Sequence, residues 1–149
     1  LSGKMAIITA QQKGSARVNW QQDGDDYRLN LSSIVGTHIL ELSRSKGEIT
    51  LIDNEGKPHQ SQDAEALVYQ LTGWNIPVQG LPEWIKGLPG KAEFELNPDS
   101  SLASVRDGQW QIVYGDYRDQ DGYRLPHQLT MTGQGSRLKL QINQWTLVR

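Results

Sequence analysis

Residues 16–31 read ARVNWQQDGDDYRLNL, a pattern that indicates β-structure. Apolar and polar side chains alternate on both sides of a turn rich in Asp and Gly. The apolar positions are Ala16, Val18, Trp20, Tyr27, Leu29 and Leu31. Because successive side chains of a strand point to opposite faces, each run predicts a strand with one buried and one solvent-exposed face. Such strands are typical of antiparallel sheets, so we predict a hairpin here.

The same alternation returns further along the chain, at residues 110–114 and 138–142. Short turns containing Gly separate the runs, for example Lys46-Gly47 and Asp107-Gly108. Gly tolerates the positive φ that tight hairpin turns require. The runs therefore predict consecutive hairpins, which form a meander or a barrel.

A predicted helix interrupts the strands at residues 63–73. Asp63 can cap its N-terminus and Gly73 suits its C-terminal end. Between them Ala64, Leu67, Val68 and Leu71 form one apolar stripe at helical spacing. A second helical turn is expected over residues 81–86, starting with Pro82. We expect roughly five strands, this helical excursion as a plug on the sheet's dry face, and roughly four more strands.

Length and composition favour one globular domain. The 149 residues match the usual size of a domain, so we assign residues 1–149 to a single unit. The formal net charge of −2 provides no field that would gather nucleic acid. The absence of Cys excludes disulfides and thiolate chemistry.

The sequence offers no support for catalysis. His38, His59 and His127 lie far apart and form no metal-binding motif, so exposed or hydrogen-bonded structural roles suit them better. No motif pairs a nucleophile with a base. We therefore expect no enzymatic activity, no metal and no cofactor.

The link after the third predicted strand is unusually apolar for a hairpin tip. Ile34 and Val35 stand between a pair of Ser residues and Gly36, where polar residues are the rule. Two alternatives remain open at this point: the two side chains fold back onto the core, or they project and contact another apolar phase.

The middle of the chain resembles a known family. Residues 71–78, LTGWNIPV, are followed by Leu81, Trp84-Ile85 and Gly87-Leu88-Pro89-Gly90. This run is similar to the LolB family, the outer-membrane lipoprotein receptors of Gram-negative bacteria. The likeness extends over nearly the whole chain, and residues 71–90 are its most specific part.

The resemblance implies an open, unclosed antiparallel β-barrel covered by short α-helices, with an apolar cavity for acyl chains. It also implies a monomer that accepts triacylated lipoproteins from the periplasmic carrier LolA and inserts them into the inner leaflet of the outer membrane. A protruding apolar loop touches the bilayer in that family, and the matching position is Val35. The family commonly has Pro-Leu where this chain has Ile34-Val35, which keeps the loop apolar and shortens its reach.

The resemblance further implies a location on the periplasmic face of the outer membrane, where a lipidated N-terminal Cys anchors the full-length protein. This chain starts at Leu1 without that Cys, so we expect a truncated, soluble form.

We therefore predict a non-enzymatic lipoprotein receptor whose membrane-contact loop is Ile34, Val35 and Gly36. The residues chosen for the acyl-chain cavity, some of which will belong to the plain core, are Val18, Trp20, Leu29, Leu31, Leu67, Leu71, Trp110 and Ile112. The alternatives are a soluble periplasmic carrier of the LolA type and a lipocalin-like binder of apolar ligands. Both would lack the membrane-touching tip.

Overall fold

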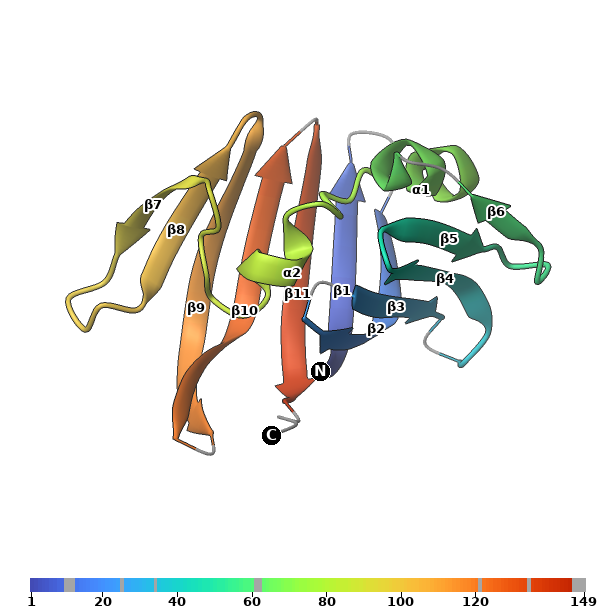
Figure 1. Cartoon of the computed structure of the whole chain (residues 1–149). Helices are drawn as coiled ribbons and strands as arrows, with labels where there is room; N and C mark the ends of the chain where they lie inside the picture. The colour runs from blue at the N-terminus through green and yellow to red at the C-terminus, as the bar shows by residue number, and fades with distance from the viewer. Residues whose placement is uncertain are drawn as a thin grey trace.

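The computed structural model describes residues 1–9, 13–24, 26–33, 35–60, 63–120, 122–133 and 135–145. It contains one antiparallel sheet of eleven strands with two short helices against it (Figure 1). The strands are β1 (Ser2–Thr9), β2 (Lys13–Asp23), β3 (Asp26–Ser32), β4 (His38–Ser45), β5 (Glu48–Ile52), β6 (Pro58–Gln60), β7 (Glu93–Leu96), β8 (Leu102–Asp107), β9 (Trp110–Gln120), β10 (Tyr123–Gly133) and β11 (Ser136–Gln144).

The strand order is β6-β5-β4-β3-β2-β1-β11-β10-β9-β8-β7, so the first and last strands of the chain pair at the middle of the sheet. β6 and β7 are its two edges and do not pair with each other. The sheet curves around the helices without closing (Figure 1). The prediction of an unclosed antiparallel barrel is confirmed.

Alternating burial follows the alternating sequence. In β2 the side chains of Ala16, Val18 and Trp20 are buried, whereas Arg17 and Asn19 between them are exposed. Buried and exposed side chains alternate in the same way in β3 and β11. The buried apolar side chains form one cluster on the inner face of the sheet, and the helices contribute Val68 and Trp84 to it.

The predicted helix is present as α1 (Ala64–Thr72). The Asp63 carboxylate accepts a hydrogen bond from the Ala66 N–H at 3.0 Å, which caps the first turn. Gly73 ends the helix in the left-handed conformation with φ 77°, and its N–H donates to the Tyr69 carbonyl.

The second helix, α2 (Leu81–Trp84), ends two residues before the predicted Lys86. The chain turns back there because the N–H of Gly87 donates to the Trp84 carbonyl at 3.0 Å. Gly80 precedes the helix, and a Cβ at that position would lie 2.3 Å from the Trp84 ring. Glycine is therefore the residue that lets this indole pack against the chain.

Within the described residues six strands precede the helices and five follow them, where the sequence indicated about one fewer in each half. The short edge strands β6 and β7 are the difference. β6 has only three residues and begins with a proline. β7 alternates Glu and apolar residues over only four positions, and all four side chains are exposed in the fold.

No helix within the described residues has the length and apolar character needed to cross a membrane.

Candidate functional site

A cleft of about 1310 Å³ opens at one end of the inner face, next to α2. Its walls come from the start of β1, the β2–β3 hairpin, residues 85–89 after α2, the β7–β8 turn, the hairpin end of β9 and β10, and the end of β11. This volume exceeds the roughly 300–1,000 Å³ that is usual for small-molecule sites. The cleft is therefore large enough for a ligand with long chains.

The apolar lining of the cleft includes Trp20, Ile85, Leu102, Tyr117, Leu125 and Trp145. Trp20 is buried and stacks on Tyr27 with 4.8 Å between ring centroids, while its indole N–H donates to the Gln22 side chain. The Trp145 indole N–H donates to the Pro126 carbonyl at 2.9 Å. Because both indole N–H groups already have acceptors, the rings offer a ligand apolar surface.

The rim of the cleft carries the charged side chains of Lys86, Asp99 and Arg124, of which Asp99 and Arg124 pair with each other. Arg124 contacts Asp99 at 2.9 Å and Asp119 at 3.5 Å, and its guanidinium lies 5.9 Å from the centroid of the Tyr117 ring. Hydrogen bonds from Ser101, reinforced by Arg124, hold the pKa of Asp99 below its usual value.

Tyr117 joins this rim to the apolar lining. Its hydroxyl donates to the Leu102 carbonyl at 2.6 Å. Burial, and then the negative charge of Asp99, raises the pKa of Tyr117 to about 12. The hydroxyl therefore stays neutral at physiological pH, and Tyr117 adds no charge to the lining of the cleft.

Tyr114 positions α2 beside the cleft. Its buried hydroxyl donates to the Trp84 carbonyl at 2.6 Å and so joins β9 to the end of the helix. Burial raises the pKa of this phenol far above its usual value. Ile85, the next residue along the chain, is thereby held in the cleft wall.

The eight predicted cavity residues are distributed unevenly. Trp20 lines the cleft. The side chains of Val18, Leu29, Leu31, Trp110 and Ile112 are buried in the core outside the cleft lining. On α1, Leu67 is half-buried and Leu71 is 37% exposed, and neither lines the cleft. Contact of these residues with an acyl chain stays a prediction.

Sequence reasoning missed most of the cleft lining, including Ile85, Leu102, Tyr117 and Leu125. Leu102 and Leu125 come from strand starts and Ile85 from the segment after α2, where periodicity gives little signal. Tyr117 lies within β9, where the alternation that buries Tyr114 predicts the opposite face. A usable signal did exist for Ile85, because it lies within the stretch that carries the family resemblance.

The loop between β3 and β4 is tight and projects an apolar side chain. The Ser33 N–H donates to the Thr37 carbonyl, the Ser33 carbonyl accepts from the Gly36 N–H, and the Ser33 hydroxyl accepts from the Thr37 N–H. Gly36 adopts a φ of 94°, which favours glycine. Val35 is 89% exposed and so does not fold back onto the core. Ile34 lies outside the described residues.

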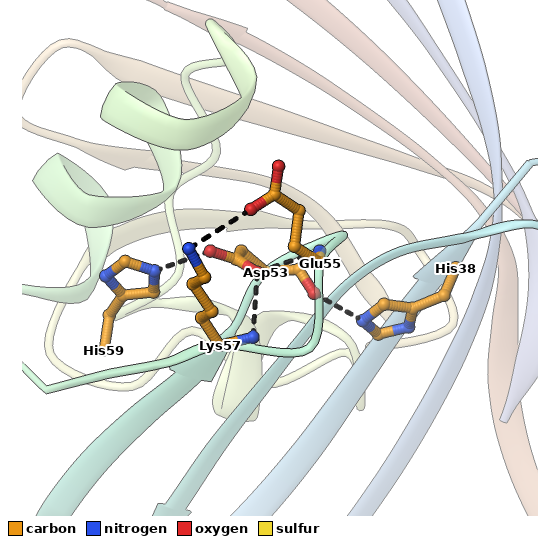
Figure 2. A network of polar contacts seen from close by, with 5 residues as sticks. All are labelled: His38, Asp53, Glu55, Lys57 and His59. Atoms are coloured by element: carbon orange, nitrogen blue, oxygen red, sulfur yellow. Dashed lines mark hydrogen bonds and ion pairs between the residues drawn. The ribbon is translucent and has the colours of Figure 1, made fainter.

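A polar network holds the strand that follows this loop (Figure 2). His38, the first residue of β4, contacts the Asp53 carbonyl through Nε2 at 3.1 Å. The Asp53 carboxylate contacts His59 Nε2 at 2.8 Å and accepts from the N–H groups of Glu55 and Lys57. These bonds, first the one from His59, lower the pKa of Asp53 to about 2.

The third histidine, His127, is buried, and its Nδ1 lies 3.1 Å from the Leu125 carbonyl. All three histidines therefore have hydrogen-bonded structural positions, as predicted. The cleft and the Val35 loop lie at opposite ends of β3, because Gly24 precedes the strand and Ser33 follows it.

Comparison with known proteins identifies the family. Residues 1–145 match the family model for the outer membrane lipoprotein LolB. The chain is 93% identical to the outer-membrane lipoprotein LolB of Aeromonas salmonicida, over all of this chain and 77% of that protein. It is 46% identical to LolB of Tolumonas auensis, with the same shares of both chains covered.

A solved structure supports the fold. The DUF1329 family protein of Desulfovibrio piger superposes with a TM-score of 0.58 at 9% sequence identity, over 94% of this chain and 81% of that chain. At this identity the likeness concerns the fold alone. The family match and the names of the relatives assign the protein to the outer membrane and to the localisation of lipoproteins there. The chain belongs to the LolB family of outer-membrane lipoproteins.

Proposed function

We propose that this protein is a non-enzymatic receptor that accepts lipoproteins from the periplasmic carrier LolA and inserts them into the inner leaflet of the outer membrane. The acyl chains occupy the cleft beside α2. The observation that carries the proposal is the combination, in a LolB-family chain, of a cleft of about 1310 Å³ with apolar lining and a loop tip whose Val35 is 89% exposed.

The chemistry of the cleft suits acyl chains. These chains form no hydrogen bonds, and each methylene removed from water contributes about 0.8 kcal/mol to binding. The lining offers indole and aliphatic surface, while Asp99 and Arg124 pair with each other at the rim. Because burial of acyl chains is non-directional, one cleft can serve lipoproteins whose protein parts differ.

Release requires a competing apolar phase, which the bilayer supplies. Val35 inserted into a membrane would contribute roughly 1.5–3 kcal/mol, enough for transient contact and too little for stable anchoring. A transient contact brings the loaded receptor to the bilayer and lets it leave after delivery. No step in this sequence needs a nucleophile, a metal or a cofactor.

The Val35→Glu variant tests the role of the loop. Its expected phenotype is normal uptake of a labelled triacylated lipoprotein from loaded LolA, with delivery to liposomes reduced at least tenfold because the carboxylate opposes insertion. Val113→Glu is the matched control, since Val113 is 49% exposed on β9, away from the loop. Normal delivery by Val35→Glu would overturn the role of the loop.

A soluble carrier of the LolA type and a lipocalin-like binder predict a different outcome. Neither needs a membrane-touching tip, so sedimentation with liposomes would be the same for the wild type and for polar substitutions at Ile34 and Val35. We expect sedimentation of the wild type to exceed that of the substituted forms.

A further inference from the structure

The outer face of the sheet carries a polar hollow of about 330 Å³, which shares Ser2 and Asn19 with the edge of the cleft and is otherwise not used by the proposed function. It lies across β3, β2, β1 and β11, which are neighbours in the sheet. Its polar and charged lining includes Lys4, Arg17, Asn19, Asn30, Ser32 and Asn143. The pairing of β1 with β11 is irregular at this place, because Ser2 pairs with Gln144 and Gly3 with Ile142, so Asn143 is skipped.

Two cations face each other in this hollow. Lys4 and Arg17 are direct cross-strand partners in the β1–β2 register, and both are exposed. Like charges in that arrangement destabilise a sheet. Neither side chain has an ion pair within the described residues, and no described carboxylate lines the hollow. The fold therefore keeps an uncompensated cationic pair.

The neighbouring groups complete a site for an anion. Asn19, Asn30 and Asn143 carry amide N–H donors, and Ser32 carries a hydroxyl. Arg offers a planar fork that fits phosphate oxygens, and Lys adds a compact charge. This donor set matches the chemistry of a phosphate group.

Further basic side chains lie on the outer face of β2 and β11. Lys13, Arg137 and Lys139 are exposed there, at alternating positions in register with Arg17 and Asn143. On the described part of β1, β2 and β11 the acidic residue is Asp23, six residues beyond Arg17 and thus about 20 Å away. On β4, Glu41 is the cross-strand partner of Asn30 and forms an ion pair with Arg28 at 3.1 Å. A chain whose net charge is −2 therefore has a local basic surface.

The hollow lies next to the loop that bears Val35. Arg17 pairs with Ser32, the last residue of β3, and the loop that bears Val35 starts at the next residue. A cationic pair at the base of an apolar tip adds electrostatic attraction to anionic lipids to the apolar contact that Val35 makes. We propose that this hollow binds the phosphate of a phospholipid headgroup at the bilayer surface while Val35 enters the hydrocarbon, an inference that rests on the proposed function.

Co-sedimentation with vesicles tests this inference. The probe is phosphatidylcholine vesicles containing phosphatidylglycerol, and the variant is Lys4→Gln/Arg17→Gln in the full chain. Because each basic residue near an anionic surface contributes to binding, we expect the vesicle partition coefficient of the variant to fall roughly 30-fold. Lys91→Gln/Arg106→Gln is the control: it removes one Lys and one Arg elsewhere and should partition like the wild type. A double variant at positions 4 and 17 that matches this control would overturn the inference.

Three further measurements distinguish a headgroup site from a structural cation pair and from a site for free anions. Loss of a like-charge pair should leave the urea midpoint of Lys4→Gln/Arg17→Gln equal to or above that of the wild type, and a lower midpoint would count against the site. Inorganic phosphate should displace the wild type from vesicles more than chloride of equal ionic strength. Saturable binding of inorganic phosphate without any change in vesicle partition of the double variant would identify a free anion and overturn the headgroup assignment.

The proposed function and this inference fail separately. Normal delivery of lipoprotein by Val35→Glu would contradict the proposed role of the loop, whatever the vesicle partition of Lys4→Gln/Arg17→Gln. Defective delivery by Val35→Glu, together with wild-type vesicle partition of Lys4→Gln/Arg17→Gln, would contradict only the headgroup site in the hollow.

Discussion

Asp53 has a larger structural role than its place in a surface turn suggests. Its carboxylate holds two backbone N–H groups and His59, while its own carbonyl accepts from the ring of His38. It thus connects the β5–β6 turn with the first residue after the Val35 loop. Sequence reasoning treated His38 and His59 as structural residues but could not pair them with Asp53, because the pairing depends on the β4–β5 register.

We predict that Asp53→Asn lowers the stability of the fold at neutral pH. The folded-state pKa of about 2 lies below the ordinary value of 3.8, so Asp53 stabilises the protein fully above about pH 4 and loses this contribution as the pH falls towards 2. Urea unfolding measured across this range should show a shallower pH dependence for Asp53→Asn. Asp23→Asn, which changes an exposed carboxylate at the end of β2, is the control and should keep the wild-type slope. Equal slopes in all three proteins would show that the network contributes nothing.

The elements of the fold differ in how well the sequence predicts them. α1 was predictable because Asp63 and Gly73 bracket an apolar stripe at helical spacing. β2, β3 and β11 were predictable because each alternates over its length. β7 was not predicted, because its alternation of Glu and apolar residues covers only four positions and its existence depends on pairing with β8.

A buried side-chain hydrogen bond joins β9 to the end of α2. We predict that Tyr114→Phe lowers the free energy of unfolding by about 0.5–1.5 kcal/mol, because the Trp84 carbonyl loses the Tyr114 donor and keeps only the Gly87 N–H. The loss should appear as a lower urea midpoint with an unchanged slope. Tyr69→Phe changes a tyrosine that is 53% exposed on α1 and serves as control. A Tyr114→Phe midpoint equal to that of the control would contradict the role of this bond.

At the scale of the whole molecule, alternation along the strands predicts which face of the sheet is dry but not how the dry face is filled. Val18, Leu29 and Ile112 pack into the core, whereas Trp20, near the end of its strand, reaches the cleft. The difference arises from where the helices end over the sheet, and α2 leaves one end of the inner face open beside residues 85–89. That outcome depends on tertiary packing, so the sequence alone could not locate the cleft.

The cleft as a whole yields a paired prediction on β7. Leu96 and Phe94 are both 52% exposed, but Leu96 lines the cleft and Phe94 does not. Leu96→Glu should weaken retention of a triacylated lipoprotein by about tenfold, because it sets a charge against an acyl chain, while Phe94→Glu should leave retention unchanged. Equal retention by the two variants would exclude this wall of the cleft from the binding site.

Photo-cross-linking from the acyl chains shows where the protein binds them. A lipoprotein with photoactivatable groups near the ends of its acyl chains is transferred from LolA to the wild-type protein and irradiated, and the adducts are located by mass spectrometry. Our account predicts adducts in the cleft lining, on Trp20, Leu102 and Leu125. Adducts confined to the outer face of the sheet, or retention of the lipoprotein with no adduct inside the cleft, would contradict it.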